Sequence, residues 1–290
     1  MTAVTSPIHG VDVLRYTAFS DDPAGGNPAG IVLDAEGLDE TTMLDIAREV
    51  GYSETAFLWP LERPGDYRIR YFSPAAEVPF CGHATIASAV ALADHDRGGD
   101  LRFQTQSGEV AVSVSADHQG RTTATLTSVT PAVTDVSEPV VTEALAALGW
   151  TGADIDPHLP PRDSFAGAHH LVFGVRSRAV LAGLAYDFER LRALMTSEGW
   201  TTVQLVWRED PTKFHARVPF PVGGVVEDPA TGAAAAALGA YLRELGLVRP
   251  PATVTIHQGD DMGRPSLLTV AIDPGRGGIR VSGTAVPLPL

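Results

Sequence analysis

The sequence predicts an α+β protein of two pseudo-symmetric halves, each a β-sheet rolled around one central apolar helix. Two observations lead to this class. A segment of the first half recurs 148 residues later, and each half holds one short helix with no charged side chain on any face. The remaining chain alternates short β-runs with turns, so strands wrapped around one buried helix account for each half.

The repeat is clearest where residues 51–59 align with residues 199–207 without a gap. A helix-like pattern precedes each segment, and Asp39 can cap the first helix while Asp187 can cap the second. The apolar positions that line one face of these helices are Met43, Ile46, Ala47 and Val50 in the first half, and Phe188, Leu191 and Met195 in the second.

The same offset of 148 places Phe72 on Phe220 and Cys81 on Pro229. We therefore expect halves at 1–128 and 129–283, with a last strand at 284–290 that can return to the first half. The joining stretch at 129–165 contains several prolines and fits a linker that holds a short helix at 141–148.

The two apolar helices are expected at 84–93 and 232–242. A helix that is apolar all round is buried, and at about ten residues neither can cross a bilayer. The surrounding β-runs are expected at 11–17, 31–33, 56–59, 67–72, 101–105, 110–114, 123–126, 171–175, 203–207, 215–218, 253–256, 267–272 and 279–281.

Composition narrows the possible partners. Hydrophobic residues make up 44% of the 290 positions, which is enough for a real core. The net charge of −14 argues against nucleic acid or an anionic membrane as partner. A small anionic substrate stays compatible, because backbone dipoles act locally. The sequence shows no secretion signal and no apolar run of about 18 residues, so we expect a cytoplasmic protein.

The sequence gives no sign of a metal or another cofactor. Cys81 is the single cysteine, so we expect neither an intrachain disulfide nor a cysteine-based metal site. HExxH, Walker and GxGxxG patterns are missing. His169 and His170 are adjacent, so on a strand they point to opposite faces, an arrangement that is poor for joint metal binding.

Both apolar helices begin at a glycine-containing motif, residues 80–85 and 227–232. A helix start offers free backbone N–H groups and partial positive charge, and two such starts facing each other would bind a carboxylate. Ordinary capped helix starts, with Asp228 or Thr231 as the cap, are the alternative. The substrate-binding candidates are Cys81, Gly82, Thr231, Gly232 and Ala233.

Glu54 is the candidate proton carrier, because it enters an apolar strand and a carboxyl group partly withdrawn from water can exchange protons at working pH. An exposed turn residue is its alternative. His83, in the first turn of a buried helix, either moves a proton or bonds to backbone. Cys81 precedes that helix and is either a thiolate or a small buried residue.

Six weak motifs in order resemble the phenazine-biosynthesis PhzF-like family, which has the diaminopimelate epimerase fold, from about residue 11 to residue 287. The motifs are Val11-Asp12 with Gly26-Asn27-Pro28-Ala29, Ser53-Glu54-Thr55, Phe72-Ser73-Pro74 with Glu77, Phe80-Cys81-Gly82-His83, Glu227-Asp228-Pro229-Ala230-Thr231-Gly232, and Gln258-Gly259 with Met262-Gly263-Arg264-Pro265-Ser266.

The resemblance implies an isomerase that needs no cofactor, is often a homodimer, and moves a proton on a small carboxylate-bearing substrate. It implies that Glu54 is the proton carrier, with His83 and Asp228 as further catalytic residues. Backbone near Gly82 and Gly232 would hold the substrate carboxylate. Family members commonly carry a serine where this chain has Ala233, so the substrate is open.

Three other readings compete with a proton-shifting isomerase. A racemase that uses two thiols needs a second cysteine, and the offset of 148 puts Pro229 in its place, so it is excluded. A lyase or cyclase that begins with the same proton transfer stays open. A non-catalytic small-molecule-binding relative has no need of Glu54, His83 and Asp228 together.

Overall fold

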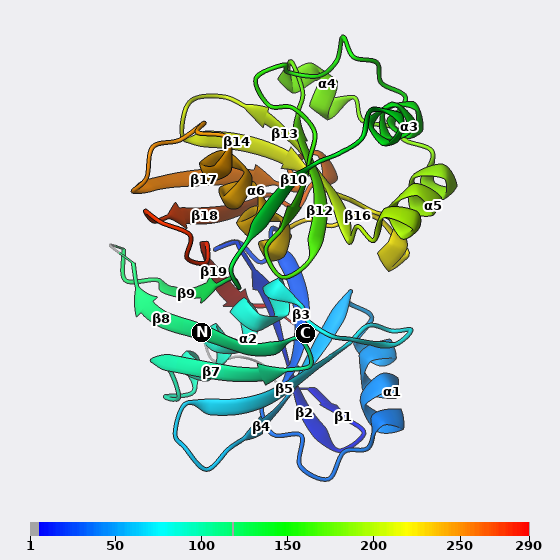
Figure 1. Ribbon diagram of the computed structural model, residues 1–290. Coiled ribbons are helices and arrows are strands. Elements are labelled where there is room, and N and C mark those ends of the chain that lie inside the picture. The colour runs from blue at the N-terminus through cyan, green and yellow to red at the C-terminus, as the bar shows by residue number, and fades with distance from the viewer. Residues whose placement is uncertain (1–5, 118, 290) are drawn as a thin grey trace. The chain divides into compact units, whose positions relative to one another are not determined.

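The computed structural model describes residues 6–117 and 119–289 of the chain (Figure 1). The chain divides into two compact units. Unit 1 holds the residues up to Thr127 together with those from Ser282 onward, and unit 2 holds Ser128–Val281. Each unit combines strands with few helices and is described by itself below.

Unit 1 is a sheet that closes on itself. Its helices are α1 (Glu40–Val50) and α2 (Gly82–Asp94). Its strands are β1 (Ser6–Ile8), β2 (Val11–Ala18), β3 (Asn27–Val32), β4 (Glu54–Pro60), β5 (Asp66–Phe72), β6 (Glu77–Val78), β7 (Asp100–Thr105), β8 (Gly108–Ala116), β9 (Thr122–Thr127) and most of β19 (Arg280–Pro287).

The strands β2, β3, β4, β5, β7, β8 and β9 pair in this order, and β19 pairs with both β9 and β2. Two of these pairs, β3–β4 and β5–β7, are parallel. Parallel neighbours need a crossover connection, and α1 and α2 supply the two crossovers.

The helix α2 is the core of unit 1. It contacts β2, β3, β4, β8 and β9, and its residues are buried without interruption from His83 to Leu92. This confirms the expectation of a buried apolar helix. The helix α1 packs on β4 and β5, with Met43, Ile46, Ala47 and Val50 buried and with the Asp39 carboxylate accepting a bond from Thr42 N, as predicted.

Unit 2 has helices α3 (Glu138–Leu148), α4 (Arg178–Ala182), α5 (Phe188–Glu198) and α6 (Gly232–Glu244). Short 3-10 turns cover Pro221–Gly223 and Asp260–Met262. Its strands are β10 (Ala132–Asp135), β11 (Arg162–Phe165), β12 (His169–Gly174), β13 (Thr202–Arg208), β14 (Lys213–Arg217), β15 (Pro219–Phe220), β16 (Val225–Glu227), β17 (Ala252–Gln258) and β18 (Ser266–Ile272).

The topology of unit 2 repeats that of unit 1. The strands β11, β12, β13, β14, β17 and β18 pair in this order, with the same directions as β2, β3, β4, β5, β7 and β8. The buried helix α6 contacts β10, β11, β12, β13 and β18, so it occupies the place of α2. The duplication predicted from the sequence is therefore real, and each half has the predicted architecture.

One ion pair recurs in both units and corrects the register of the repeat. The Arg70 guanidinium donates to Glu77 at 2.6 Å and 2.5 Å, and Arg217 donates to Glu227 in the same two-pronged way. Each glutamate lies five positions before the glycine that starts the central helix. From Glu77 onward the equivalent residues are therefore 150 apart.

The expected offset of 148 thus fails at this motif, although it holds at the start of β4 and β13. The extra length lies around the Pro221–Gly223 turn, which unit 1 lacks in the described residues. Cys81 precedes α2 as its N-cap residue, and the residue in that position before α6 is Thr231. The prediction that Pro229 is the counterpart of Cys81 is therefore wrong. The counterpart of Pro229 is Pro79.

Two smaller expectations hold only in part: the short helix expected at 141–148 lies within α3, and Leu191 and Met195 of α5 are buried. The stretch at 129–165 is no linker, because it supplies β10, α3 and β11 to unit 2 and Ser164 Oγ donates to Ala237 O of α6 at 2.8 Å. In α5, which Asp187 caps as predicted, Leu194 takes a buried position beside Leu191 and Met195, whereas Phe188 is half-buried.

Each expected β-run overlaps a strand. Within the part of the chain that the structure describes, no helix is both long enough and apolar enough to cross a membrane.

Candidate functional site

The candidate site residues of unit 1 lie at and beside the start of α2. Cys81 is extended, with φ −144° and ψ 114°, and Gly82 begins the helix. The side chain of Cys81, the N-cap residue, makes no capping hydrogen bond to α2, whereas the side chains of Asp39 and Asp187 cap α1 and α5. The first N–H groups of an α-helix have no carbonyl partner within the helix, so an uncapped start presents donors and partial positive charge.

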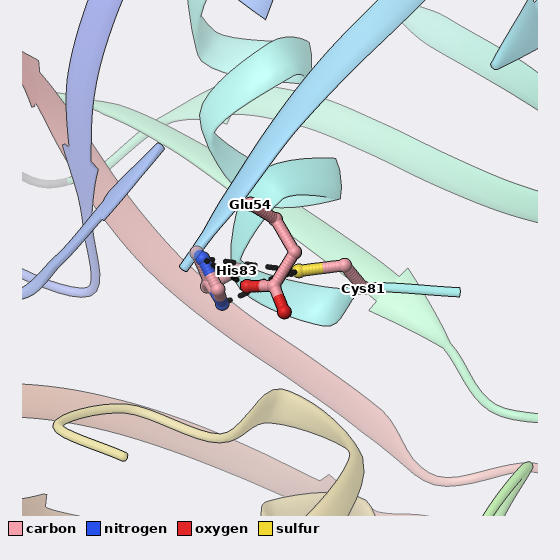
Figure 2. A group of neighbouring side chains, drawn as sticks. All are labelled: Glu54, Cys81 and His83. Carbon is pink, nitrogen blue, oxygen red and sulfur yellow. Dashed lines mark hydrogen bonds and ion pairs between the residues drawn. The ribbon is translucent and has the colours of Figure 1, made fainter. Parts of the chain in front are cut away.

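Glu54 lies beside this helix start. It is the first residue of β4 and pairs with Ala29 of the parallel strand β3. Its Oε2 lies 3.4 Å from His83 Nε2 and 3.6 Å from Cys81 Sγ, and Cys81 Sγ lies 3.3 Å from His83 Nδ1. Figure 2 shows the three side chains converging, from β4, from the residue before α2 and from its first turn. The Glu54 side chain keeps 12% exposure, whereas His83 and Cys81 are buried.

Polar neighbours fix the histidine ring. The Asn27 side-chain amide Nδ2 lies 3.1 Å from His83 Nδ1, and Ser53 Oγ lies 3.4 Å from Nε2. An amide N–H only donates, so in this arrangement Nδ1 accepts and Nε2 carries the ring proton toward Glu54. The buried Asn27, by donating to Nδ1, therefore sets the tautomer in which the nitrogen that faces the carboxylate carries the proton.

A second buried chain of bonds holds Cys81 in place. Thr85 Oγ1 donates to Cys81 O at 2.6 Å, and the Tyr71 hydroxyl lies 2.7 Å from Thr85 Oγ1. Burial raises the pKa of Tyr71 far above its usual range, so this phenol stays protonated and serves as a fixed dipole.

The same three side chains could also hold a metal ion. Among the described residues, Glu54, Cys81 and His83 form a group whose potential ligand atoms all lie within 4.8 Å of one another. We had expected no cysteine-based metal site because the chain has one cysteine. The fold adds a carboxylate and an imidazole to that cysteine, and such a mixed set needs no second thiol.

Unit 2 builds a different cluster at the start of α6. Thr231 Oγ1 donates to Asp228 Oδ2 at 2.6 Å, and Gln258 Nε2 donates to Asp228 O at 2.7 Å. Gln258 Oε1 accepts from Thr231 N at 3.3 Å. The next residue, Gly259, has φ +80°, and a side chain there would collide with the carbonyls of Pro229 and Arg264. Glycine is therefore required where this turn packs against the Asp228 segment.

The structure thus brings Glu54, Cys81 and His83 together next to Gly82, and their roles stay predictions. It places Asp228 and Thr231 in direct contact before Gly232 and the half-buried Ala233. Asn27, Ser53 and Gln258 are contacts of the candidate residues to which the sequence alone assigns no role. Each stands in one of the quoted motifs, and only Ser53 is adjacent in sequence to a candidate residue, Glu54.

Comparison with known proteins places this arrangement in a wider group. A profile of the family described as "Phenazine biosynthesis-like protein" matches residues 16–289. The trans-2,3-dihydro-3-hydroxyanthranilate isomerase of Pseudomonas chlororaphis is 34% identical over 87% of this chain and 86% of its own length.

Solved structures agree with the sequence relatives. A phenazine biosynthesis protein of the PhzF family from Bacillus anthracis superimposes with a TM-score of 0.86 and 27% identity, over 96% of this chain and 97% of that one. A probable proline racemase from Agrobacterium radiobacter has a TM-score of 0.66 at 12% identity, over 95% and 90% of the two chains. That second likeness shows the fold alone, which is the epimerase-like fold of the sequence expectation.

Proposed function

Since the chain belongs to the phenazine biosynthesis-like family and is an isomerase of that family, we propose that its reaction shifts a proton on a small carboxylate-bearing metabolite, with Glu54 as the proton carrier. The isomerase class rests on the curated relatives. The reaction type and the role of each residue are our proposal.

One observation carries the proposal: a largely buried carboxylate, an imidazole and a thiol meet within hydrogen-bonding reach at an uncapped helix start. Proton transfer needs a base that is within about 2.6–3.2 Å of the proton it takes, directly or through one water, once the substrate is bound. The 12% exposure of Glu54 leaves its carboxylate accessible to such a substrate.

Each group has one task in this mechanism. Glu54 takes a proton from one substrate carbon, and the electron pair that remains moves through the conjugated system of the substrate. Glu54 then returns the proton to a second carbon, so no atom is gained or lost. The Nε2–H of His83, set by Asn27, donates toward the carboxylate or toward charge that develops on the substrate.

The substrate carboxylate binds at the start of α2 in this proposal. The N–H groups of Gly82, His83 and Ala84 belong to the first helical turn, and an anion there is stabilised by them and by the helix dipole. The expected roles of Asp228, Thr231, Gly232 and Ala233 in binding or catalysis stay predictions.

The test uses proton exchange with solvent. We would incubate the protein in D₂O with trans-2,3-dihydro-3-hydroxyanthranilate, the compound in the name of the Pseudomonas relative, and follow deuterium at each carbon by NMR. If that compound is inert, other cyclic or unsaturated acids follow, because Ala233 offers no side-chain hydroxyl to a substrate.

We expect the native protein to incorporate deuterium at the carbon that receives the proton. The Glu54→Gln variant should not incorporate it. Undiminished incorporation in Glu54→Gln would remove Glu54 from its role. Release of a leaving group or ring closure, in place of a shifted double bond, would favour a lyase or cyclase over an isomerase.

A further inference from the structure

We propose that Glu54, Cys81 and His83 form a binding site for a zinc ion, and that zinc occupying this site inhibits the enzyme. The metal site follows from the three side chains themselves. The inhibition rests, in addition, on the proton-carrying role proposed for Glu54.

The distances between the three ligand atoms fit one tetrahedral ion. Zinc binds thiolate sulfur at about 2.3 Å and nitrogen or oxygen at about 2.0–2.2 Å. Tetrahedral angles then require ligand atoms about 3.4–3.6 Å apart. Here Nε2 and Oε2 are 3.4 Å apart, Sγ and Oε2 are 3.6 Å apart, and Sγ and Nε2 are 3.8 Å apart. The three atoms therefore need to move by only tenths of an ångström to share one ion.

The charges also match. Zinc brings two positive charges, and the Glu54 carboxylate and the Cys81 thiolate bring two negative ones, so the bound group is neutral. Neutrality matters because all three side chains are largely withdrawn from water, where an unbalanced charge is costly. Binding replaces the S–H bond of Cys81 by an S–Zn bond, and the displaced proton leaves to solvent.

The polar neighbours supply the outer shell that such sites use. A histidine that binds zinc through Nε2 keeps its proton on Nδ1 and donates it to a fixed acceptor. Asn27 lies 3.1 Å from Nδ1, and turning its amide by 180° presents the oxygen there. Three protein ligands leave the fourth position of the ion open to water or substrate, as in mixed-ligand zinc sites.

Zinc and the proton compete for the same lone pair. An ion on Glu54 Oε2 removes the acceptor that the proposed reaction needs, and an ion on Nε2 removes the donor of His83. The enzyme is therefore expected to work without metal and to lose activity when zinc binds.

Binding is tested directly on the whole protein. Titration calorimetry with Zn²⁺ should show one ion per chain. Co²⁺ should give a near-ultraviolet sulfur-to-cobalt charge-transfer band, which can come only from Cys81, the single cysteine. Cys81→Ala and Glu54→Gln should each weaken zinc binding by at least about 100-fold, since loss of an outer-shell partner alone costs about 10–100-fold.

A matched control separates this site from adventitious binding. His169 and Asp163 form a histidine–carboxylate pair at 3.0 Å in unit 2, with an exposed imidazole. His169→Ala should leave the tight site unchanged. Zinc binding that survives Cys81→Ala or Glu54→Gln, or cobalt binding without the sulfur band, overturns the site. If Cys81→Ala lowers the melting temperature, Cys81→Ser and the cobalt band of the native protein decide the matter.

Activity measurements with zinc distinguish the proposed metal site from the proposed role of Glu54. Zinc should abolish deuterium exchange and EDTA should restore it. Zinc that binds with the sulfur band but leaves exchange intact upholds the site, and overturns both the inhibition and the role of Glu54. Failure of zinc to bind, with exchange lost in Glu54→Gln, overturns the metal site and leaves the proposed function standing.

Discussion

Units 1 and 2 share one scaffold and differ in the side chains placed on it. Both have the same strand order, the same buried central helix and the same arginine–glutamate pair before that helix. Both central helices begin at a glycine without a side-chain cap at the preceding residue. The duplicated parts are therefore those that position a helix start.

The differences lie at equivalent positions beside the two central helices. Glu54 pairs with Ala29 in unit 1, whereas Thr202 pairs with the fully buried His170 in unit 2. Thr202 Oγ1 and His170 Nδ1 lie 2.8 Å apart, so that position is occupied by a closed polar pair. At an offset of 150, His83 corresponds to Ala233. Unit 1 therefore has a carboxylate and an imidazole at positions where unit 2 has a hydroxyl and a methyl group.

The largest effect is expected at Glu54. We expect Glu54→Gln to lower turnover by about 10²- to 10⁴-fold, the usual contribution of a positioned acid or base. Glu49→Gln, at an exposed glutamate of α1, is the control and should leave turnover unchanged. The measurement is the deuterium-exchange rate per folded molecule. Equal rates in the two variants would mean that Glu54 is not the proton carrier.

The next effect concerns the repeated ion pair. The Arg217 and Glu227 side chains are 11% and 7% exposed, compared with 23% and 15% for Arg70 and Glu77. Breaking a buried pair from one side costs about 3–5 kcal/mol, and an exposed pair about 0–1 kcal/mol. We expect Arg217→Met to lower the free energy of unfolding by about 3 kcal/mol and Arg70→Met by about 1 kcal/mol, both measured in urea.

An exposed pair provides the reference for that comparison. Arg190 and Glu143 pair on the surface of unit 2, so Arg190→Met should produce no measurable change. A larger loss for Arg70→Met than for Arg217→Met would reverse our ranking of the two units.

A third effect concerns acid stability. Burial lowers the pKa of His170 to about 3, below the ordinary value of about 6.5. Between these values the unfolded chain binds a proton that the folded chain does not, so stability is lost as the pH falls. The loss is about 1.4 kcal/mol per pH unit. His170→Asn keeps a polar group near Thr202 and should remove this slope from the unfolding free energy. If the unfolding free energy of the two proteins fell equally with falling pH, His170 would not be the source of the slope.

The smallest effect is expected at Thr202, the position equivalent to Glu54. Thr202→Val takes the hydroxyl away from His170 Nδ1 and should cost about 1 kcal/mol of stability. Deuterium exchange per folded molecule should stay unchanged, because this polar pair serves the fold of unit 2. A loss of exchange comparable to that of Glu54→Gln would show that both equivalent positions act in the reaction.

Much of the fold was predictable because its signals are local. The amphipathic face of α1, its Asp39 cap and the charge-free run of α2 can all be identified in the printed sequence. The register of the repeat was predictable only in part. The match at β4 and β13 has no gap, but the turn at Pro221–Gly223 adds residues before α6, so the same offset does not hold at the helix starts. The motif residues at 77–82 and 227–232 show the offset of 150 once that turn is allowed for.

The candidate site was predictable in its members and not in its contacts. Glu54, Cys81 and His83 were named from motifs, but their shared ligand-like geometry depends on a strand and a helix that only the fold brings together. The same holds for Asn27, which lies 56 positions from His83 and contacts its ring from the first residue of β3. Long-range pairing of this kind leaves no periodicity in the sequence.

The closing strand β19 sets the order in which the chain can fold as it is made. Domains generally fold as units during synthesis, with the N-terminal one first. In this chain the sheet of unit 1 is closed by residues from Ser282 onward, which pair with β2 and β9. All of unit 2 leaves the ribosome before those residues do. The half that carries Glu54 therefore begins synthesis first and is completed last.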